Sequence, residues 1–388
     1  MSVMLAGCAS EPVVRQPGPD SMFSDQLFAA PSERISAEDL FAMSPEMRQY
    51  LAVELVPGPE QDDVRNMLYQ KLYAEGQLKL EYDATMTRNA AQAFAAKSGN
   101  CLSLVVLTAA FAKELGVPVR FQTVYLDEDW SRRDGIEFFT THVNVTLGVQ
   151  AGIEKGGGQD TDLTIDFLPP KDFGHHRTRR LAENTVVAMY MNNRAAESLR
   201  EKPLDRAYWW ARAAISQDPG YMPGYNTLGI VYKLHGNLRE AQRVFERILE
   251  LEPENAIAMG NLVMVFNELG MTAQAEALAG RLKAIRPHSP FFYFDQGMEA
   301  MNQQDFVAAR DLFARQIQRD DSNSQAHFWL GRAYEQLGET KNAAKEISIA
   351  IDTSTMGADR KLYVAELARL NAAARRGAVP SRALPAVR

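Results

Sequence analysis

A period of 34 residues in the second half of the chain constrains its fold more than any other feature. Pro219, Pro253, Pro287 and Asp321 stand at consecutive 34-residue steps. A fixed period of this length is typical of stacked units, each of which buries its apolar face against its neighbours. The second half of the chain is therefore predicted to form an elongated array of repeats.

Small and aromatic residues recur in register with this period. The unit that can be read in full contains Tyr225, Leu228, Gly229, Tyr232, Gly236, Ala241, Phe245 and Pro253. This pattern resembles the tetratricopeptide repeat, a helix–turn–helix unit of about 34 residues. The small residues Gly229 and Ala241 are expected to let the two helices of a unit approach. Tyr232 and Phe245 are expected to fill the space between repeats.

Five such units are predicted over residues 184–355, of which the first is degenerate. A helix over 356–376 is expected to cover the last apolar face, and 377–388 are expected to be a disordered tail. Arrays of this kind form a concave surface, so the resemblance implies a peptide or protein ligand there. The alternative is that the array only packs against the first domain.

The turn Gly99-Asn100-Cys101 carries the strongest indication of chemistry. Asn100 is a favourable N-cap residue, and apolar residues at spacings of three and four predict a helix over 102–115. Cys101 would then lie in the first helical turn. Unpaired backbone N–H groups and the positive end of the helix dipole favour a thiolate at that position.

Two residues that could complete a nucleophilic site follow on strand-like runs. His142 opens the run 142–147, and Asp166 lies within the run 163–168. An acid between Ile165 and Phe167 on an apolar strand needs a partner, because burying an unpaired charge is costly. A cysteine, a base and an orienting acid together fit thiol catalysis. A buried cysteine with only a packing role is the alternative.

The segment around Cys101 resembles the nucleophile segment of the bacterial transglutaminase-like superfamily. Residues 98–103, Ser-Gly-Asn-Cys-Leu-Ser, match its Gly-x-Cys helix start, and 115–120, Leu-Gly-Val-Pro-Val-Arg, match its Leu-Gly-Val/Ile-Pro turn. The runs around His142 and Asp166 resemble its histidine and aspartate strands. A glycine-rich insertion between those two strands departs from the family pattern. The resemblance implies an α+β papain-like or transglutaminase-like domain over 32–183, followed by an all-α tetratricopeptide solenoid.

The resemblance also implies a mechanism. Cys101 would attack an amide or ester carbonyl, and His142 would hold the thiolate and later protonate the leaving amine. Asp166 would orient His142. Asn100 or Gln92 is suggested as a side-chain donor to the oxyanion, and Trp130 as a lining residue of the acyl groove. An exposed position of Trp130 on a hairpin is the equal alternative.

The function that follows is a cysteine-dependent amide hydrolase, protease-like or acyl-transferring. It would act on a peptide or protein substrate docked by the repeats. The alternative is an inactive transglutaminase-like fold that serves, with the repeats, as a protein-binding scaffold in the cell envelope. A fast reaction of Cys101 with alkylating reagents would favour the enzyme.

The first residues suggest a lipid anchor. The run Leu5-Ala6-Gly7-Cys8 resembles the lipobox of bacterial lipoproteins, which implies that Cys8 is lipidated. Residues 1–8 are therefore predicted to be a short signal with its lipobox, and 9–31 a flexible tether. The basic residues that usually precede a lipobox are missing, and a chance match is the alternative. The expected location is the periplasm, with attachment to the outer membrane only through Cys8.

Composition excludes several other classes of protein. The net charge is −7, which argues against a nucleic-acid-binding protein. No apolar run approaches the ~20 residues that span a bilayer. Neither a phosphate loop nor a dinucleotide fingerprint is found, and the pair His175-His176 lacks zinc-ligand spacing, so no cofactor or metal is predicted. The basic run Arg177, Arg179 and Arg180 is predicted to be a solvated linker.

Overall fold

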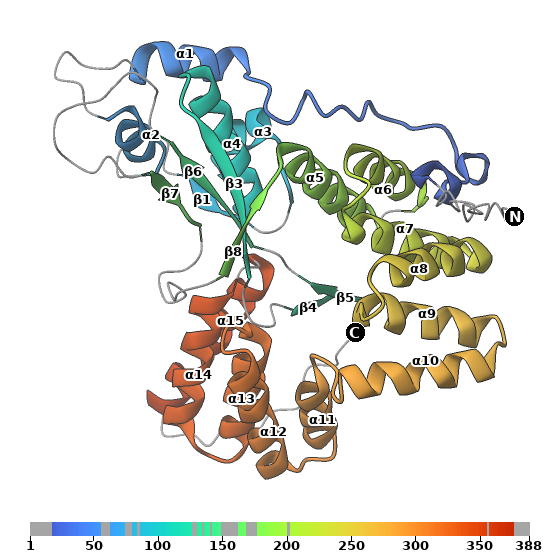
Figure 1. Cartoon of the computed structure of the whole chain (residues 1–388). Coiled ribbons are helices and arrows are strands. Elements are labelled where there is room, and N and C mark those ends of the chain that lie inside the picture. The colour runs from blue at the N-terminus through green and yellow to red at the C-terminus, as the bar shows by residue number, and fades with distance from the viewer. Residues whose placement is uncertain are drawn as a thin grey trace, which may run out of the picture.

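A computed structural model describes most of the chain, with several gaps. The described residues are 18–55, 63–73, 80–83, 86–125, 130–133, 136–139, 142–148, 162–167, 177–199, 202–354 and 357–375. They form an N-terminal α+β domain followed by a curved array of helices (Figure 1). This confirms the predicted fold class. Cys8, His175, His176 and the predicted tail 377–388 lie outside the described residues, so the lipid anchor stays a prediction.

The helices of the N-terminal domain surround one buried helix, α4. They are α1 (Pro45–Glu54), α2 (Val64–Tyr73), α3 (Ala90–Ala96) and α4 (Cys101–Glu114). The Asn100 side chain accepts a hydrogen bond from the backbone of Ser103, which is the N-cap predicted for this helix. All side chains from Leu102 to Ala112 are buried. The apolar helix therefore forms the centre of this domain, with Cys101 at its first position.

A four-stranded sheet lies against α4. Its strands are β3 (Val119–Tyr125), β6 (His142–Leu147), β7 (Leu163–Ile165) and β8 (Arg177–Leu181). Their order is β7-β6-β3-β8, and every neighbouring pair is antiparallel. Helix α4 packs mainly on β6 and less on β3. All six side chains of β6 are buried, which agrees with its central place between the helix and its neighbouring strands.

Two short strand pairs complete the α+β domain. Strand β1 (Glu81–Tyr82) runs parallel to β2 (Ser98–Gly99), directly before α4. Strands β4 (Trp130–Arg133) and β5 (Ile136–Phe139) form an antiparallel pair apart from the main sheet. Only the backbone of Trp130 belongs to the described structure, so its suggested place in an acyl groove stays a prediction.

The solvated linker predicted at Arg177, Arg179 and Arg180 is wrong. These residues form strand β8, which pairs with β3 so that Arg179 lies opposite Thr123. The side chains of residues 178–180 are exposed, as a basic run requires. The backbone nevertheless satisfies its hydrogen bonds against the open edge of β3, a demand that composition does not reveal.

The array consists of helix pairs. Its helices are α5 (Glu183–Ser198), α6 (Asp205–Gln217), α7 (Met222–His235), α8 (Leu238–Leu251), α9 (Ala256–Glu268), α10 (Thr272–Ile285), α11 (Phe292–Asn302), α12 (Phe306–Arg319), α13 (Ser324–Gln336), α14 (Thr340–Thr353) and α15 (Gly357–Arg375). A methyl group added at Gly229 would lie 2.6 Å from the Phe245 ring, so the close approach predicted there is real. Gly297 meets Phe313 in the same way two repeats later.

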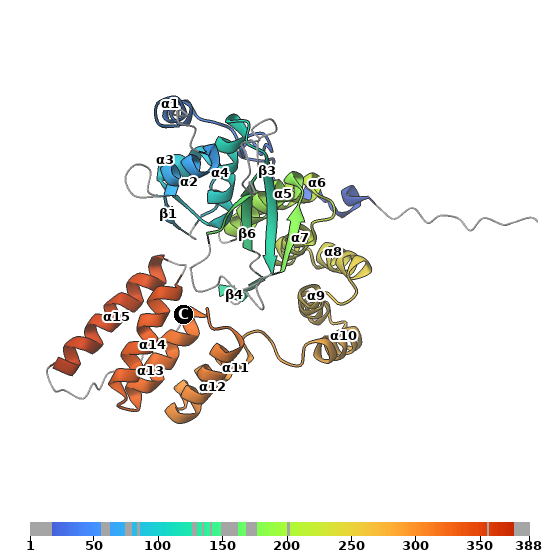
Figure 2. The same cartoon turned by 60° about the vertical axis from the view of Figure 1, so that its left-hand side comes forward.

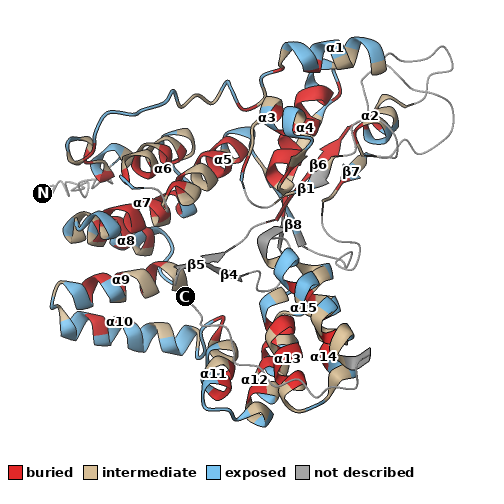
Figure 3. Cartoon of the chain, turned by 180° about the vertical axis from the view of Figure 1, so that it is seen from behind, coloured by how far each residue is buried: buried red, intermediate tan, exposed pale blue. Residues whose placement is uncertain are grey.

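The apolar core does not follow the boundary between the two sequence patterns. One contiguous core runs from Met22 in the N-terminal segment to Leu278 in α10. Separate smaller cores form among α11–α15, where Tyr363 of α15 stacks on Phe328 with ring centroids 4.6 Å apart. Figure 3 shows the buried residues along both stretches. The N-terminal domain and the first three helix pairs therefore share one core.

Residues 18–31 differ from the flexible tether expected over 9–31, whose first part, 9–17, lies outside the described residues. Residues 18–31 lie along the array and form two short 3-10 helices, Pro19–Met22 and Asp25–Leu27. Phe28 stacks on Tyr208 of α6 with ring centroids 3.9 Å apart, and Trp209 donates to the carbonyl of Ala29 at 2.7 Å. The reason is that apolar side chains within a polar stretch find a matching surface about 180 residues away.

The sheet presents one end to the array. The arrowhead of β3 points toward the side of the molecule that holds α9–α15, in the views of Figure 1 and Figure 2. Val124, near that end of β3, lies opposite His142. The start of β6 therefore faces the helical array, which places the predicted base on that side of the domain.

Candidate functional site

The predicted base and acid are hydrogen-bonded to each other. His142 Nε2 lies 2.7 Å from Asp166 Oδ1, and the histidine is only 6% exposed. His142 is the first residue of β6, and Asp166 directly follows β7, its neighbour in the sheet. The antiparallel register of these strands brings the two side chains together across 24 residues of sequence.

Cys101 meets the same imidazole. Burial lowers the pKa of His142, but its hydrogen bonds to Asp166 and Cys101 and the charges of both groups outweigh this. The pKa of His142 is raised from 6.5 to about 10. Cys101 is a free cysteine, partly accessible, at the N-terminus of α4. The structure thus brings all three residues of the predicted catalytic set together around His142.

A fourth side chain, Asn144, holds the acid from its other oxygen. Its Nδ2 donates to Asp166 Oδ2 at 3.2 Å, so both carboxylate oxygens of Asp166 are engaged. Asn144 is 4% exposed, and among the described residues its Oδ1 has no hydrogen-bond partner. Asn144 was not among the site residues predicted from the sequence. Its position two residues after His142 places it on the same face of the strand, which was the available signal.

Packing also fixes the segment that carries Asp166. The ring of Phe167, the next residue, lies 5.1 Å from the ring of Tyr73. The Tyr73 hydroxyl in turn shares a hydrogen bond with Thr108 of α4 at 2.5 Å. The acid is therefore tied to the helix that carries Cys101 through an apolar contact and a buried hydroxyl pair.

The turn before Cys101 is held by a local network. Asn100 Oδ1 accepts from the backbone and the hydroxyl of Ser103, at 2.9 and 2.8 Å. Asn100 Nδ2 donates to the Thr87 hydroxyl at 2.8 Å. A methyl group at Gly99 would lie 2.5 Å from Ser103 Cβ, so only glycine fits beside that buried serine. Both ends of the Asn100 amide thus hold the turn.

Gln92, the other suggested oxyanion donor, lies at the start of α3. Its side chain accepts from the backbone of Asn89, while Asn89 accepts from the backbone of Gln92. This reciprocal arrangement is a capping box on the exposed side of the helix. The structure does not bring Gln92 to Cys101 in any contact among the described residues.

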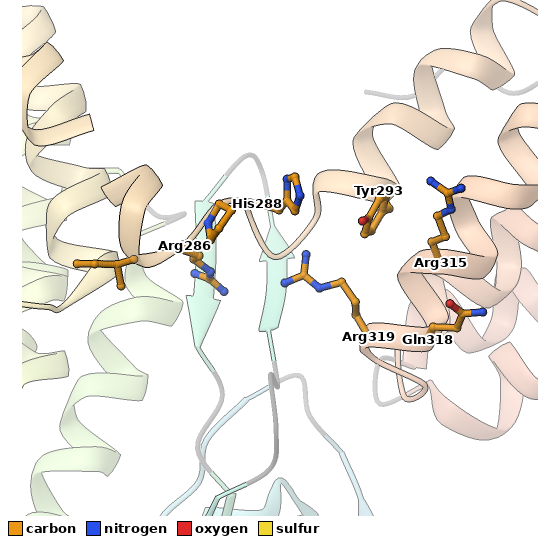
Figure 4. Close-up of a pocket in the computed structure, with 8 residues that line it drawn as sticks. Arg286, His288, Tyr293, Arg315, Gln318 and Arg319 are labelled. Atoms are coloured by element: carbon orange, nitrogen blue, oxygen red, sulfur yellow. The ribbon is translucent and has the colours of Figure 1, made fainter. Parts of the chain in front are cut away.

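A separate, cationic pocket lies in the array between α10 and α12 (Figure 4). Its volume is about 680 Å³, and it is lined by Ile285, Arg286, Pro287, His288, Tyr293, Arg315, Gln318 and Arg319. Arg319 donates to the carbonyl of Ser289 at 3.1 Å, and the guanidinium of Arg315 lies 6.0 Å from the Tyr293 ring centroid. It shares no lining residue with the Cys101 site.

The described part of the chain contains neither a candidate metal site nor a candidate membrane-spanning helix. Within it, no group of three or more His, Cys, Asp or Glu side chains could hold a metal ion. None of the helices that the structure describes combines the length and apolar character needed to cross a bilayer.

Family models match both parts of the chain. Residues 52–154, which include Cys101 and His142, match the transglutaminase-like superfamily. Residues 233–291 and 294–357 each match the tetratricopeptide repeat. These matches fall on the α+β domain and on the array from the end of α7 to α14.

Comparison with individual proteins concerns the array. A stretch of 69 residues is 39% identical to the small glutamine-rich tetratricopeptide repeat-containing protein 2 of Saccharomyces cerevisiae, covering 18% of this chain and 20% of that protein. The chain thus spans about a fifth of that relative.

Solved structures that resemble this chain include MamA and two proteins described as TPR proteins. MamA from Desulfovibrio magneticus RS-1 is 17% identical to this chain. The match covers 43% of this chain and 94% of the MamA chain, with a TM-score of 0.25. YrrB, described as a TPR protein with an unusual peptide-binding site, is 22% identical over 46% of this chain and 92% of its own, with a TM-score of 0.25. A thermophilic TPR protein of Thermus thermophilus is 12% identical to this chain. The match covers 47% of this chain and 99% of that protein, with a TM-score of 0.30. On the family models and the fold, the chain contains a transglutaminase-like domain followed by tetratricopeptide repeats.

Proposed function

We propose that this protein is a cysteine-dependent amide hydrolase or acyltransferase that acts on a peptide or protein held by its repeats. The observation that carries the proposal is the position of His142, which is hydrogen-bonded to Asp166 and lies close enough to Cys101 for that thiol to raise the pKa of the ring. A buried imidazole between a thiol at a helix N-terminus and a carboxylate is the arrangement that activates a sulfur nucleophile.

The first half of the reaction follows from the charges of these groups. With the pKa of His142 raised to about 10, the ring is an imidazolium at neutral pH and stabilises a thiolate on Cys101. The thiolate attacks the carbonyl carbon of an amide, and in this proposal the backbone N–H of Cys101 donates to the oxyanion that forms. His142 gives its proton to the leaving amine as the C–N bond breaks, which leaves a thioester.

The second half regenerates the thiolate. Neutral His142 takes a proton from water or from an amine, which attacks the thioester carbonyl and releases Cys101. Water gives an acid and therefore hydrolysis, whereas an amine gives a new amide. Asp166, held by Asn144, keeps the ring in one orientation while its charge changes.

The repeats supply the partner in this proposal. Tetratricopeptide repeats suggest protein or peptide binding, and the sheet end at which β6 begins faces the array (Figure 2). A polypeptide bound by the array could thus lie close to the nucleophile. Among its surfaces, the pocket between α10 and α12 carries Arg286, Arg315 and Arg319, so acidic side chains fit it best.

Amide turnover in the purified protein tests the enzyme directly. Release of ammonia from glutamine-containing peptides, and incorporation of a fluorescent amine into a protein acceptor, are measured for the unaltered chain and for Cys101→Ala. Cys8→Ser is the matched control, since it removes the other cysteine of the chain. Turnover is expected to vanish in the first variant and to persist in the second.

Two results would contradict the proposal. Turnover that survives Cys101→Ala would show that the activity has another source. Absence of turnover together with slow alkylation of Cys101 at neutral pH would favour the inactive fold that serves as a binding scaffold, because a buried or unactivated thiol reacts slowly.

A further inference from the structure

The segment before α3, which supports the turn that precedes the nucleophile helix, is held from the side of the repeat array. The backbone N–H of Thr87 donates to Glu197 Oε1 at 2.6 Å, and Glu197 belongs to α5, the first helix of the array. Thr87 is 1% exposed, so this N–H cannot turn to water for a partner. A carboxylate of one module thus satisfies a buried backbone donor of the other.

The same threonine supports the cap of α4. Its hydroxyl oxygen accepts from Asn100 Nδ2 at 2.8 Å, and the other end of that amide caps the helix that begins with Cys101. The next residue, Arg88, donates its backbone N–H to the hydroxyl of the buried Ser103 at 2.8 Å. An unbroken path of hydrogen bonds therefore leads from α5 to the residue before the nucleophile.

Glu197 is itself fixed by its surroundings. Arg194, one turn earlier on α5, donates to Glu197 Oε2 at 2.7 Å, with both side chains mostly buried. Burial raises the pKa of Glu197, and its hydrogen bonds to Thr87 and Arg194 offset part of that effect. A carboxylate held in this way loses much of its hydration, which a docking contact at the surface would not require.

We propose that Glu197 is a positioning residue through which the repeat array completes the active site of the transglutaminase-like domain. The inference rests on the proposed function in so far as Cys101 is the nucleophile. When the Glu197 oxygen is withdrawn, the Thr87 N–H is left buried without an acceptor, and the turn must rearrange to satisfy it. Asn100 then loses its fixed partner, and Cys101 leaves its alignment with the helix N-terminus and with His142.

The chain offers a matched control for a role in docking alone. Lys113 Nζ lies 2.6 Å from Glu183 Oε1, and this pair also joins α4 to α5. It lies at the opposite end of α4 from Cys101. Removing the charge of Glu183 therefore weakens the same interface without touching the nucleophile turn.

The test compares three variants of the full chain in a Cys8→Ser background. Glu197→Gln keeps an acceptor oxygen at the same reach but loses the charge. Glu197→Asp keeps the charge but is one methylene shorter, so it withdraws the oxygen from Thr87. Glu183→Gln is the control. The rate at which iodoacetamide alkylates Cys101 is measured across pH 6–9, and circular dichroism verifies the fold of each variant.

The expected pattern separates reach from charge. Glu197→Asp slows alkylation at neutral pH by at least about fivefold, the lower end of typical couplings between sites, and alters its pH profile. Glu197→Gln and Glu183→Gln stay within about twofold of the unaltered chain. Equal rates for Glu197→Asp and Glu183→Gln, or a loss in Glu197→Gln as large as that in Glu197→Asp, would overturn the inference.

This outcome can be told apart from the failure of the proposed function. Alkylation reports on the Cys101 thiol without any need for substrate turnover. A chain that turns over no amide can still show slow alkylation in Glu197→Asp, which would support the positioning role and contradict the enzyme. Cys101-dependent turnover together with unchanged alkylation in Glu197→Asp would support the enzyme and contradict the positioning role of Glu197.

Discussion

Replacing Asp166 by asparagine should lower the pKa of His142. The change keeps the size of the side chain and an oxygen that can accept from Nε2, but it removes the negative charge 2.7 Å from the ring. Burial alone would lower the pKa of His142, and Asp166 is the first of the two partners that raise it. The variant therefore tests whether the carboxylate keeps the ring charged.

The expected magnitude follows from the pKa values. A rise from 6.5 to about 10 corresponds to roughly 5 kcal/mol in favour of the charged ring. An opposite charge in contact typically accounts for about 1 to 3 pH units of such a rise. In Asp166→Asn the ring should therefore lose its proton at a pH lower by about that amount.

Proton–carbon NMR of the histidine rings measures this pKa directly. The chain has six histidines, and the resonance of His142 is assigned by its loss in His142→Gln. Asp162→Asn is the matched control, because Asp162 lies just before β7 and pairs with Arg120. The control should leave the titration of His142 unchanged. A His142 that titrates near 6.5 in the unaltered chain, or near 10 in Asp166→Asn, would refute the reasoning.

The free energy of unfolding should fall as the pH rises, because His142 then loses its proton. The pKa of His142 is higher in the folded chain than in the unfolded chain, so the folded state binds its proton more tightly. The resulting stabilisation is complete below pH 6.5 and is lost as the pH rises toward about 10. Urea unfolding across this window should show a fall in unfolding free energy that is smaller in Asp166→Asn.

Two further substitutions test the packing around the site and the N-terminal segment. Gly99→Ala forces a methyl group to 2.5 Å from Ser103 Cβ and should lower the free energy of unfolding in urea by about 1–3 kcal/mol. Gly280→Ala is the control, because a methyl group added there meets nothing within 4 Å, and it should not lower the free energy of unfolding. Equal losses in the two would contradict the steric argument. Phe28→Ala removes the stack on Tyr208 and should weaken attachment of residues 18–31 by about 3 kcal/mol, seen as faster hydrogen exchange there; unchanged exchange would mean that the polar contacts alone suffice.

The helix that carries Cys101 could be predicted because its determinants are local. Asn100 caps the residues directly after it, and the apolar spacing of α4 lies within 14 residues. The repeats could be predicted for the same reason, since Gly229 and Gly297 each meet an aromatic ring of their own unit, Phe245 and Phe313. Short-range rules of this kind depend on nothing beyond neighbouring turns of the chain.

Long-range contacts were the part that the sequence did not reveal. The composition of β8 is that of a charged linker, and its partner, β3, lies more than 50 residues earlier and pairs with it along the backbone. Residues 18–31 looked like a tether because Tyr208 and Trp209, which bind them, follow about 180 residues later. In both cases the segment's own composition is that of an exposed chain, and the stabilising surface lies elsewhere.

The candidate site shows the same division. Cys101, His142 and Asp166 could be proposed because a nucleophile, a base and an acid form a recognisable set even without coordinates. Asn144 was indicated only by its place two residues after His142, and Glu197 by no local signal, because each acts on another member of the site and not on a substrate. Residues of many types can support a catalytic group. Such a residue is therefore recognised only once the structure shows which partner it holds.

The position of Glu197 changes how the two modules should be regarded. Sequence patterns divide the chain near residue 183, yet the core runs across that division and a buried carboxylate crosses it to the turn at Thr87. The change of sequence pattern near residue 183 therefore does not separate two independently packed units. An array that only carried substrate could be attached through exposed contacts such as Lys113 with Glu183. In the proposed positioning role, the additional buried contact acts through Thr87 and Asn100 and so links the repeat array to the geometry of the thiol.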